Sequence, residues 1–199
     1  MGKNVFHKME VAGIFFTLAI GFLLRGAYAW TQGSAWTVIF ASVNSSVWEQ
    51  IKVFGVPYIA WSIIILAVAR PPFRAFFTAK IMGLYTIVFG QMLLYSLFRG
   101  VIGRRVIAIE VPITLIAVVM GYILSSRLTY TRDIDSWFVT AFFALMLFVA
   151  SYFCFTYSPP QAGVFIDEKT DSYGVPASEE YNADEVLDAM YNTVYTQTN

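Results

Sequence analysis

The 199-residue chain is strongly apolar: 58% of its residues are hydrophobic, 18% are aromatic and only 13% are charged. So few polar residues could not cover a water-soluble core, and the composition predicts an all-α integral membrane protein. The formal net charge of zero conceals an asymmetry, because residues 1–157 carry 12 Lys+Arg and 5 Asp+Glu, whereas residues 158–199 carry 1 and 8. We therefore expect a basic membrane domain (1–157) and an acidic C-terminal tail (158–199), and no nucleic-acid partner.

Five apolar stretches are long enough to cross the hydrocarbon layer of a membrane, which takes about 20 helical residues. Proline, glycine or serine separates neighbouring stretches, and most tryptophans fall near their ends, as interfacial indoles do. The sequence therefore predicts a bundle of five transmembrane helices with short connections. The predicted spans are Met9–Ala29, Val53–Ala69, Phe76–Phe98, Val106–Leu124 and Trp137–Tyr157.

An odd number of spans places the two termini on opposite faces of the membrane. Basic residues then predict the orientation, because cytoplasmic loops carry an excess of Lys and Arg. The N-terminal face has Lys3, Lys8, Arg70, Arg74, Lys80, Arg127 and Arg132, and the other face has Arg99, Arg104 and Arg105. This bias predicts a multi-pass protein of the cell membrane with its N-terminus in the cytoplasm and its C-terminus outside.

A polar stretch, residues 44–52, lies where the second span begins. Asn44 is a favourable N-cap residue, and Ser46-x-x-Glu49 has the spacing of a capping box, so part of the stretch can be a helix start. Capping does not explain Lys52. On a helix, Asn44, Trp48 and Lys52 form one stripe, which suits either a ligand headgroup or a structural salt bridge.

The five-span topology brings further charges to the same face. Arg25 lies about one turn inside the first span, and Glu110 lies inside the fourth, where neither should face lipid unpaired. We expect a polar pocket in which Arg25 and Lys52 meet Glu49 and Glu110. The candidate ligand-binding residues are Arg25, Asn44, Trp48, Glu49, Lys52 and Glu110.

The tail contains two features with predicted structure. Residues 164–174 follow Pro159-Pro160 and have the pattern of a small hairpin or cap over the helix ends. Within it, Asp167, Glu168 and Asp171 do not have the spacing of an EF-hand calcium loop. Farther on, Val186, Met190 and Val194 mark one side of a short amphipathic helix. Such a helix either docks the acidic tail on a protein partner or frays.

The chain resembles a family of small bacterial multi-pass membrane proteins that carries only a domain-of-unknown-function label. The matching residues are Val43-Asn44, Ser46-Val47-Trp48-Glu49, Lys52, Glu110, Pro159-Pro160, Phe165, Asp167 and Tyr173-Gly174. Where the family pattern has a His/Glu/His cluster, this chain has Arg25, Ser45 and Gln50. Arginine and glutamine do not replace histidine as metal ligands, so we expect no metal site and no cofactor.

Three hypotheses for function remain open. The first is a non-enzymatic membrane protein whose polar pocket binds an anionic lipid headgroup, a small solute or a protein partner. The second is an intramembrane enzyme in which Glu49 or Glu110 acts as a general base. The third is a small transporter component, which the odd span number and the lack of an internal repeat disfavour.

Overall fold

The computed structural model describes residues 2–31, 35–102, 107–131, 133–167 and 172–174. Five long helices dominate this part of the chain, and short elements lie between or after them. The long helices are α1 (Gly2–Trp30), α3 (Val47–Ala69), α4 (Phe73–Ile102), α5 (Ile107–Leu128) and α6 (Phe138–Tyr157). The short elements are α2 (Ala35–Phe40), the 3-10 turns η1 (Ile134–Trp137) and η2 (Gly163–Phe165), and the strands β1 (Ile166–Asp167) and β2 (Ser172–Tyr173).

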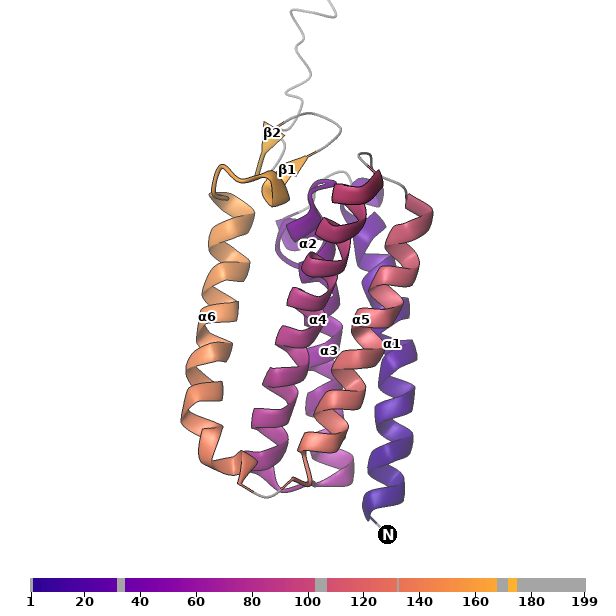
Figure 1. Cartoon of the computed structure of the whole chain (residues 1–199), viewed down its shortest axis with the longest axis vertical. Helices are drawn as coiled ribbons and strands as arrows, with labels where there is room; N and C mark the ends of the chain where they lie inside the picture. Colours follow the sequence, from indigo (N-terminus) through magenta and orange to yellow (C-terminus); the bar gives the residue numbers. More distant parts are fainter. Residues whose placement is uncertain (1, 32–34, 103–106, 132, 168–171, 175–199) are drawn as a thin grey trace, which may run out of the picture.

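The long helices run side by side as an antiparallel bundle (Figure 1). Within the described residues, five helical segments are long and apolar enough to cross a membrane, which confirms the predicted all-α membrane fold. The N-terminus lies at one end of the bundle and the β1–β2 hairpin at the other (Figure 1). We call the end with the hairpin the capped end. Which end faces the cytoplasm stays a prediction.

The helix boundaries differ from the predicted spans mainly at two starts: α1 begins at Gly2, seven residues before the predicted Met9, and α3 also begins early. Helix α3 begins at Val47, six residues before the predicted start, because the polar turn that follows Ser46 is helical and packs inside the bundle. The helix ends at Ala69, as the sequence predicted. Arg70 adopts a left-handed conformation with φ of 46°, and Pro71-Pro72 cannot continue the helix. The short helix α2 was not expected from the sequence.

Two glycines allow α4 and α5 to approach closely. A Cβ atom added at Gly121 would lie 2.8 Å from the carbonyl oxygen of Gly83, and one added at Gly83 would lie 2.7 Å from the carbonyl oxygen of Gly121. Contacts of this kind between small residues are a common way to join helices in lipid, where apolar surface alone gives little attraction between helices. The pair fixes α5 against α4 and so sets the position of Glu110 near the capped end.

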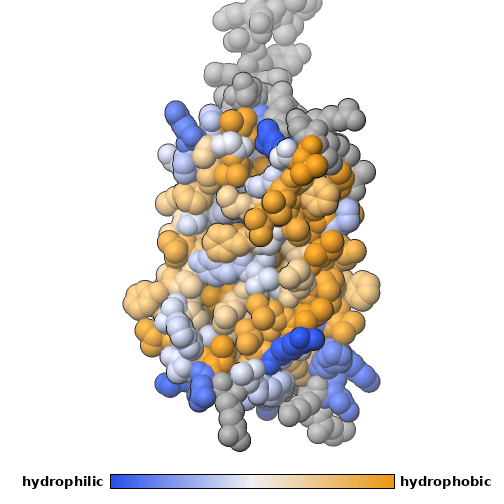
Figure 2. Space-filling view, viewed as in Figure 1, coloured by the Kyte–Doolittle hydropathy of each residue, from blue (hydrophilic) through white to orange (hydrophobic). Residues whose placement is uncertain are grey.

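The interior of the bundle has its charged side chains near both ends and is mainly apolar between them. Phe54, Leu84, Ile87 and Val118 are completely buried and belong to the central apolar cluster. The charged side chains of the interior lie toward the two ends: the half-buried Arg25 and the buried Glu10, on opposite parts of α1, are separated by about 22 Å at 1.5 Å per residue. The outer surface matches this division, with a largely apolar middle band and hydrophilic residues at both ends (Figure 2).

Candidate ligand-binding site at the capped end of the bundle

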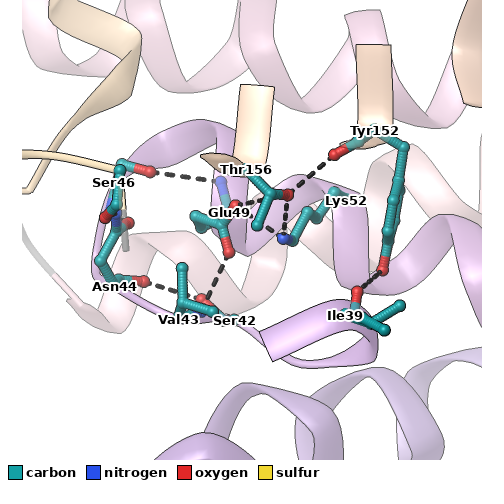
Figure 3. Close-up of polar contacts among 10 residues, drawn as sticks. Ile39, Ser42, Val43, Asn44, Ser46, Glu49, Lys52, Tyr152 and Thr156 are labelled. Atoms are coloured by element: carbon teal, nitrogen blue, oxygen red, sulfur yellow. Dashed lines mark hydrogen bonds and ion pairs between the residues drawn. The ribbon is translucent and has the colours of Figure 1, made fainter. Parts of the chain in front are cut away.

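A completely enclosed ion pair lies at the start of α3. The Nζ atom of Lys52 is 2.7 Å from Oε1 of Glu49, and the two side chains are 0% and 3% exposed. Lys52 also donates to Oγ1 of Thr156 on α6 at 2.6 Å and lies 5.1 Å from the centre of the Tyr152 ring. The other carboxylate oxygen of Glu49 accepts the backbone N–H of Val43 at 2.9 Å (Figure 3). The pair therefore ties the start of α3 to α6.

The beginning of α3 is capped by Ser46, whose hydroxyl accepts the backbone N–H of Glu49 at 3.3 Å. Asn44, predicted as a possible N-cap, has another role. Its side-chain oxygen Oδ1 accepts the backbone N–H of Ser46 at 2.9 Å, and its side-chain nitrogen Nδ2 donates to the backbone carbonyl of Gly174 at 2.7 Å. Asn44 thus precedes the helix and holds the residue that follows β2.

The polar stretch and the C-terminal hairpin form one unit, which we call the cap clasp (Asn44, Ser45, Trp48, Phe165 and Asp167). Ile166 pairs with Tyr173 and Asp167 with Ser172 in the antiparallel β1–β2 hairpin. The Asp167 carboxylate accepts hydrogen bonds from both the backbone and the hydroxyl of Ser45. The Trp48 ring packs against Phe165 at 5.8 Å between ring centres. Asn44 and Ser45, just before α3, therefore hold the cap.

A second ion pair joins α1 to α5. Nη2 of Arg25 donates to Oε2 of Glu110 at 2.8 Å and to Oε1 of Gln50 at 2.6 Å. Gln50 in turn donates to the backbone carbonyl of Ser45 at 2.8 Å, so this pair is linked to the cap clasp. The Arg25 side chain is 20% exposed, whereas that of Glu110 is 5% exposed. Arg25 therefore keeps surface toward the outside of the bundle.

The six predicted ligand-binding residues thus lie at one end of the bundle but in two arrangements. Lys52 pairs with Glu49, and Arg25 pairs with Glu110. The predicted stripe is divided: Trp48 and Lys52 contact α6, whereas Asn44 lies before the helix and contacts the residue after β2. Ligand binding by any of the six stays a prediction.

A small cavity adjoins the second ion pair. It has a volume of about 20 Å³ and is lined in part by Gln50, Glu110, Gln91 and Thr114, which is about the size needed for one water molecule. Gln91 lies on α4, in the wall of this cavity. In the described structure its Nε2 atom is buried without a hydrogen-bond partner. The cavity is too small for a lipid headgroup, so such a ligand must approach Arg25 from its exposed side.

A third buried ion pair, at the opposite end, was not recognised from the sequence. Nζ of Lys80 lies 2.7 Å from Oε2 of Glu10, and both side chains are 4% exposed. The Lys80 ammonium is also enclosed by the rings of Tyr58, Phe76 and Tyr122, at 4.7 to 5.6 Å from their centres. Lys80 therefore lies inside the bundle. It does not belong to the exposed basic residues of the N-terminal face, among which the sequence had placed it.

These charged groups do not form a metal centre. Within the described residues, no group of three or more His, Cys, Asp or Glu side chains is arranged to hold a metal ion. The expected amphipathic helix, with Val186, Met190 and Val194, lies outside the described residues, as do Glu168, Asp171, Arg104 and Arg105. The arrangement at the capped end includes the partly exposed guanidinium of Arg25, which Glu110 and Gln50 hold in place, and the buried Glu49–Lys52 pair.

Comparison with known proteins gives one match. No curated protein and no solved structure matches the chain. A family model described as a family of unknown function, DUF6512, matches residues 2–175. The match includes the five long helices, the polar stretch before α3 and the β1–β2 hairpin that it holds. The chain belongs to this family of unknown function.

Proposed function

We propose that the protein binds the phosphate of an anionic phospholipid headgroup at the capped end of the bundle, with Arg25 as the contacting cation. The observation that carries this proposal is the difference in exposure between the two cations of the candidate site. The Arg25 side chain is 20% exposed, and that of Lys52 is 0% exposed. A headgroup can therefore contact Arg25 without breaking up the bundle.

The contacts of Arg25 support its role as a phosphate ligand. In the described structure both of its hydrogen bonds come from Nη2, while a guanidinium carries five N–H donors in a planar fork. Glu110 and Gln50 hold the fork in one orientation, which lowers the entropy lost when a ligand binds. Arginine in such a fixed position suits bidentate recognition of phosphate.

The surroundings of Arg25 support a headgroup as the ligand. Trp30 at the end of α1 is 69% exposed, and Trp36 and Phe40, one turn apart on α2, are 53% and 46% exposed. Exposed indoles are typical of the level at which lipid headgroups meet the hydrocarbon layer. Arg25, five residues before the end of α1, lies within about 8 Å of that level at 1.5 Å per residue.

The proposal is tested by measuring phosphatidylglycerol binding to the purified protein in nanodiscs, against phosphatidylcholine as reference. Arg25→Gln is expected to weaken phosphatidylglycerol binding by roughly 10- to 100-fold, because a charge-assisted hydrogen bond contributes about 1.5–3 kcal/mol. Arg25→Lys keeps the charge but not the fork and should have an intermediate effect.

Arg127→Gln is the matched control. Arg127 is exposed in the last turn of α5 at the other end of the bundle, so its loss removes the same charge without touching the proposed site. Unchanged binding in Arg127→Gln together with reduced binding in Arg25→Gln supports the proposal. Equal affinities of the wild type and Arg25→Gln, in protein that remains folded, contradict it.

A further inference from the structure

A second feature of the surface is an apolar groove between α4 and α6, in the half of the bundle nearer the N-terminus. It has a volume of about 270 Å³. Its walls come from α4 between Thr78 and Tyr85 and from η1 and α6 between Ile134 and Ala144. Thr78 and Tyr85 are seven residues apart, so the groove extends about 10 Å along the helix axis. It is separate from the Arg25 site.

Two of the polar side chains in the wall of the groove, Thr78 and Tyr85, already make hydrogen bonds within the bundle. The Thr78 hydroxyl donates to the backbone carbonyl of Arg74 at 2.9 Å, and the Tyr85 hydroxyl donates to that of Ala144 at 2.8 Å. The groove thus presents mainly methyl, methylene and aromatic surface. It also belongs to membrane-spanning segments of both helices, where the surrounding solvent is lipid. A hydrocarbon chain fits this environment, and a hydrophilic solute does not.

A cation lies at the outer end of the groove. Arg74 is one helical turn before Thr78, is exposed, and has its guanidinium 5.6 Å from the centre of the Phe138 ring, the first residue of α6. Trp137, which lines the groove, is 61% exposed and begins the same helix–turn junction. An arginine and an indole at the end of an apolar groove match the charge and polarity of a phospholipid where its headgroup joins its chains.

We infer that this groove is a binding site for one acyl chain of a phospholipid whose phosphate contacts Arg74. The acyl chain lies against α4 and α6. It fills the gap that the small side chains of Ala141 and Ala144 leave between these helices. Burying this apolar surface against a chain gives a longer-lived contact than a flat helix face offers, because the lipid touches both walls. The site therefore retains its lipid when bulk lipid is washed away.

The test compares two tryptophan substitutions on the same helix. Ala144→Trp places a large ring in the groove, whereas Ala150→Trp places the same ring on an exposed part of α6 that does not line it. Each protein is delipidated in detergent, incubated with phosphatidylethanolamine, and its retained phospholipid is counted by native mass spectrometry. We expect Ala144→Trp to lose one retained phospholipid per chain and Ala150→Trp to match the wild type.

Two further variants keep the test decisive if Ala144→Trp folds poorly. Ala144→Leu fills less of the groove and should reduce retention partially, and Arg74→Gln should shorten retention without altering the groove. Unchanged phospholipid counts in folded Ala144→Leu and Arg74→Gln overturn the inference. Loss of a dimer mass in Ala144→Trp, with lipid counts unchanged, also overturns it and shows that a second copy covers the groove.

Discussion

The two ion pairs at the capped end share their chemistry but differ in access. Glu49 and Lys52 belong to one helix, and Thr156, Tyr152 and the backbone of Val43 enclose them. Arg25 and Glu110 come from two helices, and the cation keeps 20% of its surface. The enclosed pair can stabilise the bundle but cannot meet a ligand without unfolding part of it. Exposure, and not the presence of charge, therefore separates a scaffold from a candidate site.

The largest effect on stability is expected from Lys52→Met. Removing the cation leaves Glu49 buried without its counter-ion, a change that costs about 3–5 kcal/mol at buried pairs. The melting temperature in detergent should fall sharply, and phosphatidylglycerol affinity in the folded fraction should stay near the wild-type value. A melting temperature equal to that of the wild type would show that the enclosed pair is not part of the scaffold.

A smaller loss of stability is expected from Arg25→Gln. Glu110 loses its cation, but this pair is nearer to solvent, so water can replace part of the interaction. A cost within about 1–3 kcal/mol is expected for the buried group that remains. Thermal unfolding of Arg25→Gln and Lys52→Met under the same conditions compares the two losses of stability. A larger loss in Arg25→Gln than in Lys52→Met would contradict the scaffold role of the enclosed pair.

The smallest effect is expected from Ser45→Ala in the cap clasp. This substitution removes the hydroxyl that donates to Asp167 and keeps the backbone donor, so it should cost about 0.5–1.5 kcal/mol. The effect should be local, because the hairpin lies outside the helix bundle. Hydrogen exchange at residues 163–167 and 172–174 should become faster while exchange in α3 and α4 is unchanged. Equal acceleration throughout the bundle would show that the clasp supports the whole fold.

Hydropathy was sufficient to predict the five long helices, since each needs its own apolar length to cross a membrane. It did not predict that α3 begins at Val47, because the stretch Val47–Lys52 contains charges that become tolerable only after Glu49 and Lys52 pair. The short helix α2 has too few residues for a periodic signal. A helix predicted from its apolar span alone is therefore too short where a buried polar turn, such as the first turn of α3, extends it.

The candidate site was predicted in part. Topology indicated that Arg25, Glu49, Lys52 and Glu110 share one end, but not which acid meets which base, since this depends on side-chain directions around α3. Sequence reasoning missed the pairing of Glu10 with Lys80. The signal was present, because both are charged residues inside apolar spans, and the rule applied to Glu110 applies equally to them.

The central claim is that Arg25, in the partly exposed pair, binds lipid phosphate and that Lys52, in the enclosed pair, does not. The most direct measurement compares two double variants, Arg25→Gln/Glu110→Gln and Glu49→Gln/Lys52→Met. Each removes one complete ion pair, so neither leaves an isolated buried charge. Phosphatidylglycerol binding in nanodiscs should be lost in Arg25→Gln/Glu110→Gln and kept in folded Glu49→Gln/Lys52→Met. Loss only in Glu49→Gln/Lys52→Met, or an equal loss in both, would contradict the account.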